Sequence, residues 1–184
     1  MVERTARRAQ IVAAAQALLE EGGPDAVTMR AVADRVGVRA PSLYKHFADK
    51  DQLESALVAE AFRQTAQVFT DATADQKQPL ASLGAAYRGW ALEHPHLYRL
   101  MTHKELRRDE LPDGVEAAAA LPVVLAVGGD PDLARAAWAL AHGLTSLELA
   151  GRFPPDADID AAWAAGTAAL ARAAAHLATD VRTS

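Results

Sequence analysis

Residues 27–53 constrain the fold more than any other part of the chain, because they contain two short amphipathic helix patterns separated by a glycine. Thr28 precedes apolar positions spaced three and four residues apart, which predicts an N-capped helix. Gly37 follows it and can adopt the positive φ that a tight turn between helices needs. A second helix pattern then places Leu43 and Phe47 on one face. The stretch predicts a helix-turn-helix.

The opposite face of the second helix is polar and basic. It carries Arg39, Ser42, Tyr44, Lys45 and His46. An arginine can hold a guanine bidentately in the major groove, and lysine or tyrosine side chains can reach backbone phosphates. A helix-turn-helix that presents such side chains predicts binding to double-stranded DNA.

The run Leu43-Tyr44-Lys45-His46-Phe47, followed by Asp49-Lys50 and Leu53, resembles the signature of TetR-type transcriptional regulators. The resemblance implies that the second helix enters the major groove and that its first turn faces base edges. It also implies that Tyr44 and Lys50 hold phosphates. The DNA-binding residues expected from the pattern and the resemblance together are Thr28, Arg39, Ala40, Pro41, Ser42, Tyr44, Lys45, His46 and Lys50.

The net charge of the chain is −5, which taken alone would disfavour nucleic acid, but the charges are unevenly distributed. Residues 1–50 hold eight Lys and Arg against six Asp and Glu, whereas residues 51–184 hold eleven against eighteen. The basic excess coincides with the helix-turn-helix, and the acidic remainder would be repelled by a duplex.

The rest of the chain also predicts helices. Hydrophobic residues make up 51% of the sequence, alanine dominates them, and β-branched runs are few. The expected fold is all-α, with a helix-turn-helix domain over residues 1–50 and a larger helical domain over residues 51–184. A helix over about 49–71, begun by Asp49 with Gln52 three residues later, is the expected strut between the two domains.

Two long helix patterns late in the chain, over about 130–151 and 159–177, predict a homodimer. The first is apolar on two sides and therefore has two surfaces to pack against. The second carries a row of small residues that lets helices approach closely. The row consists of Ala162, Gly166, Ala169 and Ala173. The family resemblance implies the same arrangement, because TetR-type regulators dimerise through a four-helix bundle formed by their last two long helices.

Large aromatic and polar-tipped side chains stand out in the second domain, which is otherwise rich in Ala and Leu. Such side chains give a mostly apolar wall with a few polar groups, as small-molecule sites do. The expected ligand-binding residues are Tyr87, Trp90, His94, Tyr98, Met101, Trp138 and His142. The alternative is an ordinary helical core. The Trp138-x-x-x-His142-Gly143 pattern, together with residues 91–95, resembles the ligand domain of one TetR subgroup.

The histidines do not predict a metal site, because the spacing of His94, His96 and His103 matches no ligand pattern on one helical face. No motif of a nucleophilic, metal-dependent or phosphate-binding enzyme occurs, so we expect neither catalysis nor a cofactor. The chain has no cysteine. It also has no apolar run near the roughly 18 residues of a membrane span and no apolar signal-peptide core. We therefore expect a cytoplasmic protein that does not bind membranes.

Together these features predict a sequence-specific DNA-binding regulator that acts as a homodimer on an inverted-repeat operator. Repression relieved by a small-molecule ligand is the expected mechanism. One alternative is a constitutive dimeric DNA-binding protein without a ligand, and another is a small helical metal-binding protein or enzyme.

Overall fold

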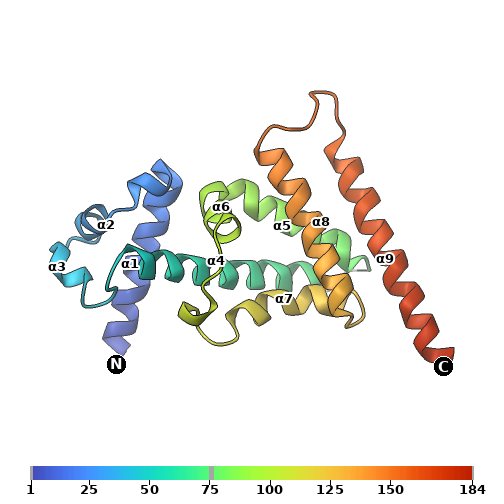
Figure 1. Cartoon of the computed structure of the whole chain (residues 1–184), viewed down its shortest axis with the longest axis horizontal. Helices are drawn as coiled ribbons and strands as arrows, with labels where there is room; N and C mark the ends of the chain where they lie inside the picture. The colour runs from blue at the N-terminus through green and yellow to red at the C-terminus, as the bar shows by residue number, and fades with distance from the viewer. Residues whose placement is uncertain (1, 75–76, 184) are drawn as a thin grey trace. The chain divides into compact units, whose positions relative to one another are not determined.

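The computed structural model describes residues 2–74 and 77–183, and within these ranges it contains helices, turns and no strand (Figure 1). The all-α prediction is confirmed. The α-helices are α1 (Val2–Gly22), α2 (Met29–Val36), α3 (Ala40–Leu43), α4 (Lys50–Thr73), α5 (Pro79–Glu93), α6 (Pro95–His103), α7 (Val115–Ala126), α8 (Pro131–Leu149) and α9 (Ile159–Thr183). Two short 3-10 helices are η1 (Pro24–Ala26) and η2 (Arg108–Glu110).

The chain forms two compact units. Unit 1 comprises residues 1–62 and 94–115, and unit 2 comprises residues 63–93 and 116–184. The expected boundary at residue 50 falls inside unit 1, which also contains α6. A direct contact accounts for the position of α6, because the Glu20 carboxylate accepts hydrogen bonds from the backbone N–H groups of His96 (3.2 Å) and Leu97 (2.9 Å). Glu20 thereby caps the first turn of α6 from α1.

The helix-turn-helix forms as the sequence predicts. The Thr28 hydroxyl accepts a hydrogen bond from the Ala31 N–H at 3.1 Å and caps α2. Gly37 has a φ of 75°, which ends α2 in the left-handed region. Val32, Leu43 and Phe47 are fully buried. The two helices are therefore held by a common apolar core.

Helix α3 is shorter than the spacing of Leu43 and Phe47 suggests. It ends at Leu43, and residues 44–46 form turns that continue from it, with the Phe47 N–H donating to the Leu43 carbonyl at 3.0 Å. Arg8 of α1 holds this turn, since its guanidinium donates to the His46 carbonyl at 2.7 Å and lies 4.1 Å from the centre of the Phe47 ring. The local geometry thus depends on a residue far away in sequence.

Helix α4 begins directly after its predicted cap. The Gln52 N–H donates to the Asp49 carboxylate at 2.8 Å, and the Gln52 side-chain oxygen accepts from the Ala48 N–H at 2.9 Å. This is close to the predicted capping box, with the return bond made to the residue before the cap. The cap fixes the position of Lys50 at the start of α4, directly after the helix-turn-helix.

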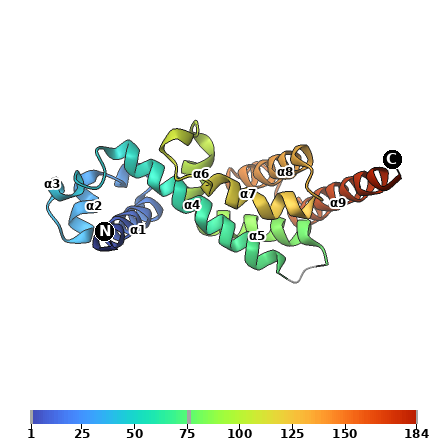
Figure 2. The ribbon, with the colours of Figure 1, turned by 90° about the horizontal axis from the view of Figure 1, so that it is seen from below.

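In unit 2, helices α5, α8 and α9 pack against one another (Figures 1 and 2). Two glycines permit close approach. A Cβ atom at Gly84 of α5 would lie 3.0 Å from the Trp163 ring of α9, and one at Gly166 of α9 would lie 2.6 Å from a methyl carbon of Leu140 in α8. The small residue at 166 therefore serves a contact within one chain.

An ion-pair cluster ties the same three helices together. Arg88 of α5 donates two hydrogen bonds to Glu148 of α8, both at 2.8 Å, and one to Asp160 of α9 at 2.5 Å. The hydrogen bonds to Glu148 and then to Asp160 raise the pKa of Arg88 above its usual value. Arg88 therefore stays charged and joins the end of α8 to the start of α9.

Within residues 2–74 and 77–183, no single helix has both the length and the apolar composition needed to cross a membrane. Helices α7 and α8 meet that requirement only when taken together, as a pair bent by 102°.

Candidate DNA-binding surface and ligand cavity

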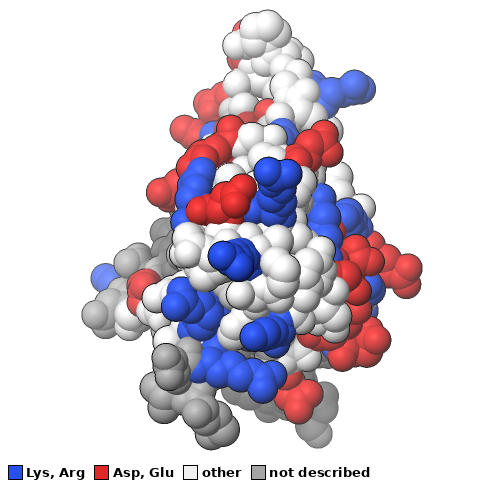
Figure 3. Space-filling view, turned by 90° about the vertical axis from the view of Figure 1, so that its left-hand side faces the viewer, with Lys and Arg blue, Asp and Glu red and all other residues white. Residues whose placement is uncertain are grey.

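The residues around α3 form an exposed surface on unit 1. Arg39, Pro41, Tyr44 and Lys45 are exposed, and Tyr44 keeps 54% of its surface accessible although it is aromatic. Figure 3 looks onto the side that carries α2 and α3, where Lys and Arg side chains are spread across the face. An exposed aromatic that precedes an exposed lysine suits contact with a polyanion.

Four more predicted DNA-binding residues are half-buried, namely Ala40, Ser42, His46 and Lys50. Three of these four belong to α3 and the turn after it. The fourth, Lys50, donates to the Pro24 carbonyl at 3.1 Å. Thr28 is exposed, but its hydroxyl oxygen already serves as the cap of α2.

Arg35 of α2 and Arg39 at the start of α3 differ in the partners of their side chains. Arg35 forms two hydrogen bonds to Glu21 of α1, at 2.9 and 2.5 Å, and both side chains are exposed. This pairing lowers the pKa of the Glu21 carboxyl and raises that of the Arg35 guanidinium. Arg39 sits at the N-cap of α3 with extended backbone angles and makes no capping hydrogen bond with its side chain. Its guanidinium is thus left for a partner outside α3.

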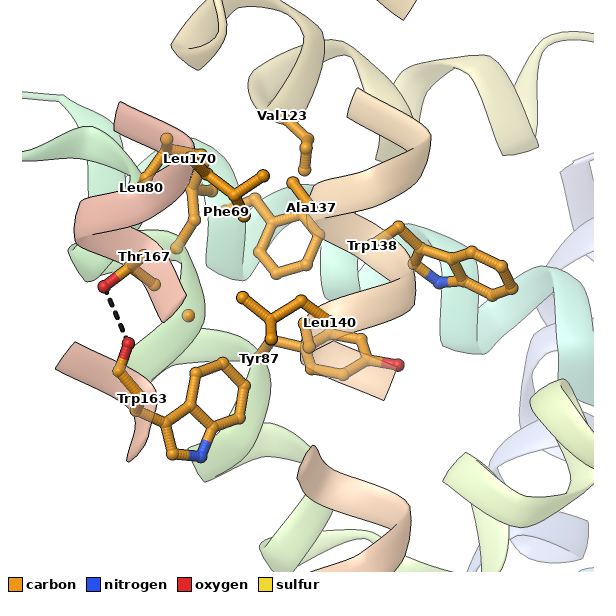
Figure 4. Close-up of a pocket in the computed structure, with 13 residues that line it drawn as sticks. Phe69, Leu80, Tyr87, Val123, Ala137, Trp138, Leu140, Trp163, Thr167 and Leu170 are labelled. Atoms are coloured by element: carbon orange, nitrogen blue, oxygen red, sulfur yellow. Dashed lines mark hydrogen bonds between the residues drawn. The ribbon is translucent and has the colours of Figure 1, made fainter. Parts of the chain in front are cut away.

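A cavity of about 50 Å³ lies in unit 2 between helices α4, α5, α7, α8 and α9 (Figure 4). Its wall contains no charged side chain. The Thr167 hydroxyl donates to the Trp163 carbonyl at 2.8 Å, so it is already engaged within α9. The lining residues are Phe69, Leu80, Leu83, Gly84, Tyr87, Val123, Ala137, Trp138, Leu140, Ala141, Trp163, Thr167 and Leu170.

Of the seven residues predicted to bind a ligand, Tyr87 and Trp138 line this cavity. Trp90 is buried but does not line the cavity. Its indole N–H donates a hydrogen bond to the Gln64 side chain at 3.3 Å. His142 does not line the cavity and stacks on the Trp138 ring, with 5.6 Å between ring centres. Trp138 itself is 54% exposed, so only part of it faces the cavity.

The other three predicted ligand residues, His94, Tyr98 and Met101, belong to unit 1 and not to this lining. His94 is the N-cap of α6. Tyr98 is fully buried. Its ring and that of His103 are arranged edge to face, with 6.5 Å between the ring centres. The sequence placed them with the cavity residues because α5 and α6 are adjacent in the chain, whereas the fold assigns these helices to different units.

Sequence reasoning did not single out Phe69, Trp163 or Leu170 as lining residues. Trp163 was recognisable as a large residue on the last helix, but the glycine that accommodates it, Gly84, is almost eighty positions away in the chain. No pattern within one helix reports such a contact. Among the residues that the structure describes, no cluster of three or more His, Asp or Glu side chains is arranged to hold a metal ion.

Two family descriptions match this chain. Residues 11–57 match the bacterial regulatory proteins of the tetR family, and residues 80–170 match the tetracyclin repressor-like C-terminal domain. An uncharacterized HTH-type transcriptional regulator of Mycobacterium tuberculosis, Rv0681, is 31% identical over 165 residues, which cover 84% of this chain and 75% of that protein. The chain belongs to the TetR family. It is a DNA-binding transcriptional regulator.

Solved structures agree with this assignment. A protein of unknown function from Rhodococcus sp. RHA1 is 25% identical with a TM-score of 0.74, over 90% of this chain and 93% of that one. A TetR variant from Acinetobacter baumannii AYE, solved in complex with minocycline, is 27% identical with a TM-score of 0.58, over 92% of this chain and 94% of that one. The TetR fold thus extends over both units of the present chain.

Proposed function

We propose that this TetR-family protein binds an inverted-repeat operator as a homodimer, represses transcription there, and is released by a small uncharged ligand. The role is regulatory and not catalytic, as in the family to which the chain belongs. The observation that carries the proposal is a set of exposed side chains, Arg39, Tyr44 and Lys45. They lie on a helix-turn-helix that has a fully buried apolar core. Rigid support of this kind is what precise recognition requires.

We assign base reading to Arg39 and Ser42 at the start of α3. The exposed Arg39 side chain has the reach and the donor geometry to hold a guanine in the major groove. Tyr44, Lys45 and Lys50 are assigned to phosphates, which fix the register of the protein on the duplex. Thr28 at the start of α2 and His46 after α3 complete the assigned set, and Ala40 and Pro41 let the backbone approach the groove.

Replacing Arg39 by alanine is expected to relax selectivity at one base pair in each half-site, at a cost of about 1–3 kcal/mol there. Binding-site selection with wild type and Arg39→Ala measures this directly. Lys45→Ala is the matched control, since loss of a phosphate contact weakens binding to all sequences alike. An unchanged selected motif for Arg39→Ala would remove this residue from the base-reading set.

The proposed dimer interface uses the exposed faces of α8 and α9. Nine alanines between residues 161 and 178 are exposed, and Arg172 is the only Lys, Arg, Asp or Glu in that stretch. Trp138 and Leu147 of α8 are also exposed, at 54% and 44%. A helix face so apolar suits burial against a second copy of itself. To read adjacent major grooves, a symmetric pair must hold its two α3 helices about 34–36 Å apart.

The cavity in unit 2 is the proposed ligand site. Because its wall is apolar and carries no charged side chain, a charged ligand would lose its hydration without an ionic partner. At about 50 Å³ it is roughly a third of the ~150 Å³ cavity that holds a benzene ring in another protein, so an aromatic ligand enters only if the surrounding helices adjust. The minocycline complex of the related TetR protein supports ligand binding by a protein of this fold. A constitutive DNA-binding dimer with a packed second unit is the alternative.

An uncharged aromatic probe such as phenol is expected to raise the melting temperature of the protein, whereas benzoate, matched in size but charged, is not. Differential scanning calorimetry over a range of probe concentrations measures this effect. Ala141→Phe should fill the cavity and abolish the shift, because Ala141 lines it. Ala118→Phe, at an exposed position of α7, is the control that should retain the shift. Equal stabilisation by both probes would contradict an uncharged site.

A further inference from the structure

The segment 104–111, which follows α6, lies against the first turns of α4 within unit 1. Lys104 donates to the Glu54 carboxylate at 2.5 Å, and Arg107 lies 3.5 Å from the Asp51 carboxylate. The Glu110 carboxylate accepts a hydrogen bond from the Ser55 hydroxyl. Three side chains of this segment thus hold the start of α4, immediately after the helix-turn-helix.

Glu54 is the member of this contact that reaches toward the DNA-binding surface. One of its carboxylate oxygens lies 3.7 Å from the Lys50 ammonium, and the other accepts the Lys104 hydrogen bond. The Glu54 side chain is only 13% exposed, whereas Lys50 is 41% and Lys104 is 64% exposed. One largely buried carboxylate is therefore shared by two partly exposed lysines.

The two lysines compete for this carboxylate. The Lys50 ammonium has three N–H donors and already donates one to the Pro24 carbonyl. At 3.7 Å its contact with Glu54 is loose, while the Lys104 contact at 2.5 Å is close. While Lys104 compensates the Glu54 charge, the Lys50 ammonium is not neutralised by that carboxylate and keeps a direction in which to donate. Without Lys104, Glu54 would draw the Lys50 ammonium into a full ion pair.

We propose that Glu54 is a positioning residue for the phosphate contact of Lys50, and that Lys104 controls how much of the Lys50 charge is available to DNA. This inference rests on the proposed role of Lys50 as a phosphate contact. It assigns a function in DNA binding to Lys104, a residue outside the helix-turn-helix. The partner is the DNA backbone, recognised by charge and not by sequence.

The experiment measures the dependence of operator affinity on salt concentration by fluorescence anisotropy, using the full-length protein. Lys50→Met should lower the salt slope by about one unit, as loss of one phosphate contact does. Lys104→Met should lower it by a similar amount and weaken binding about fivefold, comparable with the loss of one exposed ion pair. In a Glu54→Gln background, Lys104→Met should leave the slope unchanged, because no carboxylate remains to capture Lys50.

Two control variants separate this mechanism from its alternatives. Lys77→Met removes an exposed positive charge from unit 2 and should not change the slope. Arg107→Met weakens the hold of segment 104–111 on α4 without touching Glu54 and should also leave the slope intact. A slope loss for Arg107→Met equal to that for Lys104→Met, or the same loss in the Glu54→Gln background, would overturn the inference. An unchanged slope for Lys50→Met would instead refute the proposed phosphate role of Lys50 itself.

Discussion

Replacing Phe47 by alanine is expected to abolish operator binding by destabilising unit 1. Phe47 is fully buried, and the Arg8 guanidinium lies 4.1 Å from the centre of its ring. Truncating a buried phenylalanine costs about 3–5 kcal/mol, through lost transfer free energy and the cavity left behind. That loss is a large part of the stability of a typical domain. The turn after α3 would also lose the surface against which Arg8 packs.

Urea unfolding followed by circular dichroism, together with anisotropy on an operator fragment, measures the effect of Phe47→Ala. Phe153→Ala is the control, because Phe153 is a half-buried residue in the loop between α8 and α9. It should retain operator affinity and lose little stability. Operator binding by Phe47→Ala within twofold of wild type would show that the buried ring does not support the surface at α3.

Gly166→Leu is expected to disrupt the packing of α9 on α8 and, with it, the proposed dimer. A Cβ atom at residue 166 would already lie 2.6 Å from a Leu140 methyl carbon, and a leucine side chain adds three further carbons. Overpacking of this kind costs about 1–3 kcal/mol. Because α8 and α9 also carry the proposed dimer surface, displacing one from the other should raise the dimer dissociation constant. Sedimentation velocity and thermal unfolding measure the two effects.

Leu140→Ala provides the matched test of this mechanism. It vacates the space that the new side chain would enter, so the double variant should be more stable than the sum of the two single effects predicts. Additive effects would mean that Leu140 and residue 166 do not contact each other. A wild-type protein that sediments as a monomer at micromolar concentration would contradict the proposed dimer, whatever the variants do.

The sequence predicted those elements whose signals lie within one helix. The Thr28 cap, the left-handed Gly37 and the buried pair Leu43 and Phe47 all follow from local geometry, and the structure has each of them. The long helices predicted over 49–71, 130–151 and 159–177 were placed to within two residues at their ends, except that α9 continues to Thr183. The length of α3 was not predictable, because the turn that follows it is held by Arg8, which lies 38 positions away from His46.

The cavity was less predictable than the DNA-binding surface. A DNA-binding surface is built mainly from one short stretch of chain, so its residues can be read in order. The cavity wall instead combines residues from five helices, and packing decides which of them meet. Tyr87 and Trp138 were found by their size, whereas Trp90 and Tyr98 are equally large and serve as buried packing elsewhere. Aromatic size alone does not distinguish these two roles.

Arg88 has a consequence for protein engineering. By joining Glu148 to Asp160, it fixes both ends of the loop that connects α8 to α9, while residues 154–158 between them are exposed. The entropic cost of lengthening a loop whose ends are already held grows only slowly with its length. Residues 154–158 therefore offer a position at which a fluorescent reporter or an affinity tag could be inserted while the helices on either side keep their register.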